Sequence, residues 1–86
     1  IWGTTTIVSP RNLTFPTAVA ASPDGRRIAI ADTGAGRVVV CDLHARVEQI
    51  YPQLSEPRGL RFDGERLLVC ETGADRVVAI DRANGE

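Results

Sequence analysis

The stretch PTAVAASPDGRRIAIADTGAGRVVVCD, residues 16–42, decides the fold, because the chain repeats it as PRGLRFDGERLLVCETGADRVVAID, residues 57–81. When Asp24 is aligned with Asp63, ten of the first nineteen positions are identical without a gap, at an offset of 39 residues. A period near 40 residues with several short strands per unit is typical of a β-propeller blade and not of a helical solenoid. We therefore expect an all-β chain built from two blades.

Short apolar runs separated by turn residues predict the strands of each copy. The runs IAIA, VVVC, LLVC and VVAI are apolar without alternation, which indicates sheets that are covered on both faces. Turns recur too often along the chain to leave a window long enough for a helix. The expected strands of the first copy are residues 18–21, 27–31, 37–41 and 47–51, and three more are expected between residues 57 and 81.

Turn residues separate these runs. Ser22-Pro23-Asp24-Gly25 predicts a tight turn with Gly25 at positive φ, and Asp63-Gly64 predicts a two-residue type I′ hairpin connection. Gly34 and Gly73 lie at equivalent places in the next turn of each copy, so we expect both to adopt conformations that a Cβ disfavours.

Counting the strands leads to an expectation about assembly. Residues 4–8, TTTIV, predict an outer strand that ends at a proline, so the chain holds enough strands for two four-stranded antiparallel blades. Residues 1–86 form a single domain, in which blade one spans about 16–51 and blade two about 57–81. Blade two lacks its own outer strand, and the spare outer strand lies at the N-terminal end of the chain, before blade one. We expect this N-terminal strand to complete blade two of a neighbour, so that oligomerisation closes the ring, most simply as a homotrimer.

Composition excludes several classes of partner. The net charge is −1, and the ten basic and eleven acidic residues are scattered, so we expect neither nucleic acid nor a membrane surface as a partner. Because the chain begins at Ile1, we expect a processed, excised, engineered or renumbered sequence, and localisation stays unknown. Cys41 and Cys70 each end an apolar run, so we expect both thiols to be buried and reduced.

One part of the repeat resembles a known family. Ala31-Asp32-Thr33-Gly34, followed by Arg37-Val38, resembles the most recognisable part of the NHL repeat, a β-propeller blade. The resemblance covers both copies, from about Leu13 to Asp81, and the second copy departs from the pattern at Cys70-Glu71. The chain is also similar to blades of the gluconolactonase and strictosidine-synthase-like propellers. Six-bladed rings are common for this repeat type, which is why the resemblance favours three copies of a two-blade chain.

Two acids stand at equivalent positions. Asp32 and Glu71 each lie five residues before an arginine, Arg37 or Arg76, across a glycine-containing turn. Such acids could be ligands on the top face of a ring, or they could accept hydrogen bonds from turn amides and pair with the arginines to lock two strands together. We favour the structural interpretation, since a feature present in every copy usually serves the repeat.

The resemblance also suggests where a binding contact would lie. It places Arg58 and Arg61 near the central channel and its top rim, which makes them the candidate binding residues. Lactonase-like and amidating-lyase-like propellers hold a divalent metal there with acidic and amide side chains, which the innermost segments of this chain lack. His44 has no second ligand at metal-binding spacing, so we expect neither a metal nor a cofactor.

Two classes of function remain. The first is a non-catalytic propeller scaffold, or a module that binds a protein or peptide on its top face, which assembles with itself into a closed ring. The alternative is a fragment of a larger propeller enzyme, of the lactonase, lyase or thioredoxin-linked NHL type, whose site lies in missing blades. The lack of a catalytic constellation in these residues favours the first.

Overall fold

The computed structural model describes residues 13–81. These residues form seven strands in two antiparallel sheets and include no α-helix. The all-β class and the division into four strands and three are as the sequence predicts. The sheets run in the order β1 (Pro16–Ala21), β2 (Arg27–Asp32), β3 (Arg37–Asp42) and β4 (Val47–Tyr51), and β5 (Pro57–Asp63), β6 (Arg66–Glu71) and β7 (Arg76–Asp81).

The sequence repeat is also a structural repeat. β2 pairs with β3 from Arg27 opposite Asp42 to Asp32 opposite Arg37, and β6 pairs with β7 in the same register. β1 and β5 both begin at a proline, and in both the register shifts just after it. Proline has no N–H to donate to a strand ladder, so a shift at this place is expected.

The turn after the second strand has the same form in both copies. A short 3₁₀ turn, η1 (Thr33–Ala35) or η2 (Thr72–Ala74), is followed by a residue in the left-handed region. That residue is Gly36 in the first copy, with φ of 64°, and Asp75 in the second, with φ of 54°. Glycine and aspartate both tolerate this conformation better than most residues.

The hairpin turns agree with the sequence in the first copy and differ in the second. Gly25 has the expected positive φ of 74°. In the second hairpin Asp63 pairs with Arg66, so the two connecting residues are Gly64 and Glu65, and only Gly64 has positive φ. The prediction of a type I′ turn at Asp63-Gly64 is therefore wrong, because a type I′ turn needs positive φ at both central residues. The strand continues through Asp63, whose carboxylate pairs with Arg66 at 3.1 Å.

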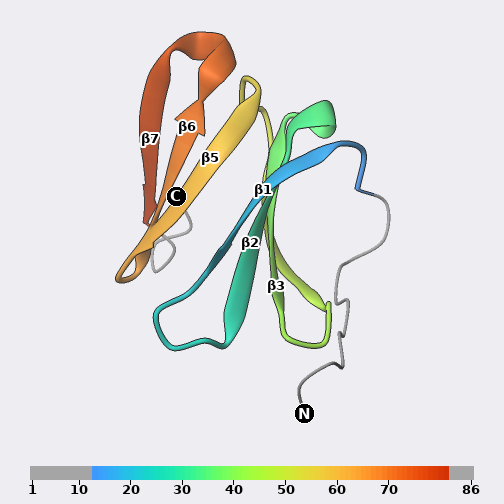
Figure 1. Cartoon of the computed structure of the whole chain (residues 1–86), viewed down its shortest axis with the longest axis vertical. Coiled ribbons are helices and arrows are strands. Elements are labelled where there is room, and N and C mark those ends of the chain that lie inside the picture. The colour runs from blue at the N-terminus through green and yellow to red at the C-terminus, as the bar shows by residue number, and fades with distance from the viewer. Residues whose placement is uncertain (1–12, 82–86) are drawn as a thin grey trace, which may run out of the picture.

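The two sheets pack against each other by one face each. Their closest contacts join β1 and β2 of the first sheet to β5 of the second. Figure 1 shows β5 beside β1, with β7 on the far side of the second sheet. The buried core between the sheets consists of Ala29, Val38 and Val40 from the first and Phe62, Leu67, Val69 and Ile80 from the second.

The small side chains on the first sheet make this packing possible. Ala29 is fully buried on β2 in the same cluster as the larger Leu67 and Phe62, and Ala31 is fully buried on the same strand. Leu67 is fully buried, and removing a buried leucine side chain typically costs about 2 to 5 kcal/mol. The sheets are thus one packed unit joined along β1, β2 and β5.

The second sheet ends at a different strand from the first. In the first sheet β3 lies between β2 and β4, whereas in the described part of the second sheet the equivalent strand, β7, is the edge. The outer strand that the sequence predicts at residues 4–8 lies outside the described residues.

Candidate functional site

The two equivalent acids are buried and fully engaged with the chain. Asp32 ends β2 with none of its surface exposed. Its Oδ1 accepts hydrogen bonds of 2.9 Å from the backbone amides of Thr14 and Phe15, and its Oδ2 accepts one of 3.0 Å from Nε of Arg37. Asp32 therefore fixes the connector that leads into β1 to the turn that leaves β2.

Glu71 does the same in the second copy. Its Oε2 accepts a hydrogen bond of 2.7 Å from the amide of Ser55, and its Oε1 accepts one of 2.6 Å from Nε of Arg76. The connector between the sheets is thereby held against the turn after β6. The ion pairs with Arg37 and Arg76 are those that the sequence predicts, but the amides belong to the preceding connector and not to the turn itself.

Hydrogen bonding keeps both acids ionised. Burial raises the pKa of Asp32, but the hydrogen bonds from Phe15, Arg37 and Thr14 outweigh burial and hold its pKa below the ordinary value of 3.8. The amide of Ser55 and the guanidinium of Arg76 hold the pKa of Glu71 below the ordinary value of 4.5, against a smaller effect of burial. With their oxygens occupied and their charges balanced, both carboxylates serve the fold and do not present a ligand site.

The turn glycines are needed for space and not for an unusual conformation. Neither Gly34 nor Gly73 has positive φ, so the expected conformation is wrong for both. A Cβ on Gly34 would lie 2.7 Å from Cβ of Phe15, and a Cβ on Gly73 would lie 3.2 Å from Ser55. The acids draw each connector so close to its turn that a side chain there would collide with it.

The candidate binding arginines both lie exposed on β5. Arg58 lies at the register shift that follows Pro57, and Arg61 lies on the face of the second sheet that points away from the core. Neither guanidinium forms an ion pair with another side chain of residues 13–81. Both arginines are thus exposed candidates for a contact, and Asp63 lies two residues from Arg61 on the same face of β5.

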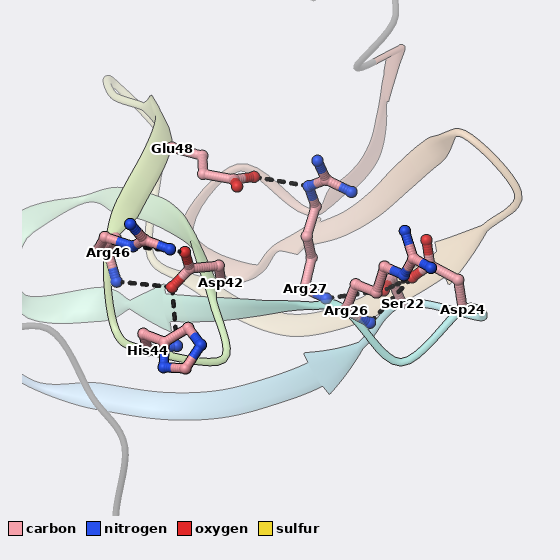
Figure 2. A network of polar contacts seen from close by, with 8 residues as sticks. All are labelled: Ser22, Asp24, Arg26, Arg27, Asp42, His44, Arg46 and Glu48. Atoms are coloured by element: carbon pink, nitrogen blue, oxygen red, sulfur yellow. Dashed lines mark hydrogen bonds and ion pairs between the residues drawn. The ribbon is translucent and has the colours of Figure 1, made fainter.

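Polar side chains also gather at the hairpin end of the first sheet (Figure 2). Nε of Arg27 binds Glu48 at 2.6 Å across the sheet, and Asp42 holds its own hairpin turn through Arg46 and the amide of His44. A small hollow of about 210 Å³ lies between this end and the turn of the second hairpin. His44 is exposed, and its backbone amide donates a hydrogen bond of 2.8 Å to Oδ1 of Asp42 (Figure 2).

The thiols differ in their surroundings. Cys41 is fully buried, and burial together with the carboxylates of Asp42 and Glu48 raises its pKa. Cys70 is exposed on the face of β6 that points away from the core, so the prediction that both thiols are buried is wrong for it. The second sheet has nothing packed on that face within the described residues.

Sequence reasoning missed two features of the surface between and beside the sheets. The hydroxyl of Thr33 is within 2.7 Å of that of Thr17 and donates a bond of 2.5 Å to the carbonyl oxygen of Pro57, which ties the first sheet to the second. An apolar hollow of about 440 Å³ lies on the opposite side of the first sheet. It is lined by Leu13, Pro16, Thr17, Ala18, Val19, Ile28 and Ile30. The recurrence of Thr-Gly-Ala is the only signal in the sequence for the bond between the sheets. The recurrence of apolar strand positions is the only signal for the hollow.

Two kinds of site are not found in the described residues. In residues 13–81 no three His, Cys, Asp or Glu side chains lie where they could together hold a metal ion. No helix in that part of the chain is long and apolar enough to cross a membrane.

Neither the known protein families nor the curated proteins include a match to this chain.

Proposed function

We propose that the chain is a pair of β-propeller blades of the NHL type and that it acts as a non-catalytic scaffold, which assembles with copies of itself into a closed ring. The observation that carries this proposal is that both ends of the two-sheet stack expose large apolar side chains. Val19 on the outer face of the first sheet is 66% exposed, and Val77 on the outer face of the second is 64% exposed. Covering such exposed apolar side chains with another layer of structure is favourable, and a further sheet could supply that layer.

The way the sheets meet supports a ring. They touch most closely along β1, β2 and β5, which we call the inner strands. The strands at the other edges, β4 and β7, lie outside this closest contact. Further sheets added in the same manner would surround an axis beside β1 and β5, as the blades of a propeller do. Six blades, the common number for the repeat type that the sequence resembles, require three copies of a two-blade chain, and a cyclic trimer leaves no face uncovered.

The open edge of the second sheet is part of this proposal. β7 occupies the place that β3 has in the first sheet, where β4 pairs with it. Residues 4–8 of a neighbouring copy would supply the missing fourth strand, so that each contact between copies would have strand pairing as well as face packing. Covering an exposed strand edge also removes a site for uncontrolled aggregation.

In such a ring the turns η1 and η2 and the start of β5 would share one rim. Arg58 is exposed there, and Arg61 lies three residues further along the same inner strand. A rigid ring that carries repeated turns and arginines on one rim suits a protein or peptide partner with acidic side chains.

The mass of the purified protein in solution tests the proposal. Sedimentation velocity should give three times the chain mass of 9.3 kDa. Protein concentrations from about 1 to about 100 micromolar cover the dissociation constants expected for such an assembly. A monomer throughout this range would contradict self-assembly. Deletion of residues 1–9 should weaken the trimer, and a trimer of unchanged stability would contradict the strand exchange. One calcium or zinc ion per chain would instead favour the propeller-enzyme alternative.

A further inference from the structure

The two sheets of one chain contact each other through unlike faces. The face of the first sheet that covers the core is rich in alanine and valine, and the face of the second sheet that receives it carries Leu60, Phe62 and Leu67. One hydrogen bond accompanies the apolar contact, from the hydroxyl of Thr33 to the carbonyl oxygen of Pro57. Since the two sheets are copies of one unit, each of these residues has a counterpart at the opposite end of the stack.

One set of counterparts forms the trailing face, which is the outer face of the second sheet with its adjoining turn. Each of its members occupies the repeat position of a residue that is buried in the first copy. Val38 is fully buried, for example, whereas its counterpart Val77 is 64% exposed, and Thr33 is buried whereas Thr72 is exposed. The trailing face consists of Leu68, Cys70, Thr72, Val77 and Ala79, which correspond to Ala29, Ala31, Thr33, Val38 and Val40.

The other set forms the leading face, which is the outer face of the first sheet along its inner strand. Pro57 is buried whereas its counterpart Pro16 is exposed, and Val19, the counterpart of the half-buried Leu60, is 66% exposed. The apolar hollow of about 440 Å³ lies on this face. The leading face consists of Pro16, Val19, Ala21 and Ile28, which correspond to Pro57, Leu60, Phe62 and Leu67. On the same side of the sheet Ile30, Val39 and Cys41, the counterparts of Val69, Val78 and Ile80, are already buried in the single chain, so the contact runs along β1 and the start of β2.

We propose that the trailing face of one copy docks onto the leading face of a second copy, head to tail, and that the hydroxyl of Thr72 donates a hydrogen bond to the carbonyl oxygen of Pro16 of that second copy. This inference rests on the proposed self-assembly and gives it a polarity and a set of contacts. The contact continues the established packing of the first sheet on the second, with each residue replaced by its repeat counterpart. It fills the hollow beside Val19 and buries Cys70, the thiol that a single chain leaves exposed.

Arg61, on the outer face of the second sheet, is compatible with this contact. Arg61 takes the repeat position of Ala20, which is only half-buried within the chain. Ala20 packs against the core between the sheets, and the longer arginine in its place can lay its methylene groups along the apolar face while the guanidinium reaches water.

Two variants that each block one face test the polarity. Val19→Asp places a charge on the leading face, and Val77→Glu places one on the trailing face. Both valines are largely exposed in the single chain, so the variants should keep the fold, which circular dichroism of each variant at low concentration checks. Each variant alone should be a monomer in sedimentation velocity. An equimolar mixture should form a 1:1 dimer, because one intact trailing face and one intact leading face remain.

Thiol alkylation of the mixture identifies the faces in contact, since the two variants differ in mass. In the mixed dimer Cys70 of the Val19→Asp chain should react slowly with iodoacetamide, and Cys70 of the Val77→Glu chain should react as in a monomer. If either variant alone still forms dimers, the contact joins like faces and the head-to-tail inference fails while self-assembly stands. If the unmodified chain is itself a monomer, the proposed function fails first.

Thr72 supplies a milder test that leaves the apolar faces unchanged. Thr72→Val should weaken the association between copies roughly fivefold to tenfold, because one buried carbonyl loses its donor. Thr72→Ser keeps the hydroxyl and should associate as the unmodified chain does. An equal loss in both variants would contradict the hydrogen bond to Pro16.

Discussion

The hydroxyl of Thr33 lies 2.5 Å from the carbonyl oxygen of Pro57 and joins the turn of the first sheet to the inner strand of the second. Thr33→Val keeps the shape of the side chain but leaves this carbonyl without its donor. We expect a loss of about 1 to 2 kcal/mol in the free energy of unfolding, measured in urea. Thr72→Val, measured at a concentration that keeps the chain monomeric, should change stability by less than about 0.5 kcal/mol. Equal losses would mean that the bond does not join the sheets.

Stability should fall in acid because of Asp32 and Glu71. The pKa of each is lower in the folded chain than its ordinary value, 3.8 for Asp32 and 4.5 for Glu71, so the folded state binds protons less readily than the unfolded state. Their contribution is present above these ordinary values and is lost as the pH falls through the lower folded values. The melting temperature should therefore be steady from about pH 7 to pH 5 and decrease below pH 4.5.

Substitution of the two acids checks their part in this profile. The double variant Asp32→Asn, Glu71→Gln should melt at a lower temperature at neutral pH and show a flatter profile in acid. Asp24→Asn removes an exposed carboxylate and should leave most of the decrease in place. A double variant that loses stability in acid as steeply as the unmodified chain would show that other carboxylates control the profile.

The turn glycines should differ in their tolerance of a methyl group. Gly34→Ala would bring the new Cβ to 2.7 Å from Cβ of Phe15 and 2.8 Å from Cγ2 of Thr14, and we expect a loss of about 1 to 3 kcal/mol. Gly73→Ala meets Ser55 only at 3.2 Å and should cost less, while the larger Gly73→Val should cost about as much as Gly34→Ala. Thermal melts rank the three variants. If Gly34→Ala were the mildest, the close approach of the connector would be wrong.

The two thiols should react at different rates in the monomer. Iodoacetamide should label the exposed Cys70 quickly and the buried Cys41 only after denaturation, because the raised pKa of Cys41 keeps it protonated as well as inaccessible. Peptide mass spectrometry after timed labelling separates the two sites. Labelling of Cys70 should slow as the protein concentration rises through the range of assembly. A rate that does not depend on concentration would contradict the burial of Cys70 between copies.

Much of the fold could be predicted from the repeat, and what could not depends on contacts across long sequence distances. The strand positions follow from apolar runs between turn residues, and the pairing of Asp32 with Arg37 follows from their positions on either side of one turn. The amide of Thr14 is 18 residues from Asp32, so no local pattern predicts that hydrogen bond. The space beside Gly34 depends on the same connector.

The exposure of Cys70 illustrates the second limit. Its apolar strand predicts burial, and its counterpart Ala31 is fully buried. The difference lies in what is stacked on each sheet, since the first sheet has the second beside it and the outer face of the second has no third sheet on it within the described residues. A repeat specifies the surface of each unit, but the number of units decides which surfaces are covered.

Native mass spectrometry of the unmodified chain tests the closed head-to-tail ring most directly, because it separates species by the number of copies. The account predicts one dominant assembly of three chains, each of 9.3 kDa, which does not grow as concentration rises. A monomer at every concentration, or a ladder of dimers, tetramers and longer species without a preferred size, would contradict it.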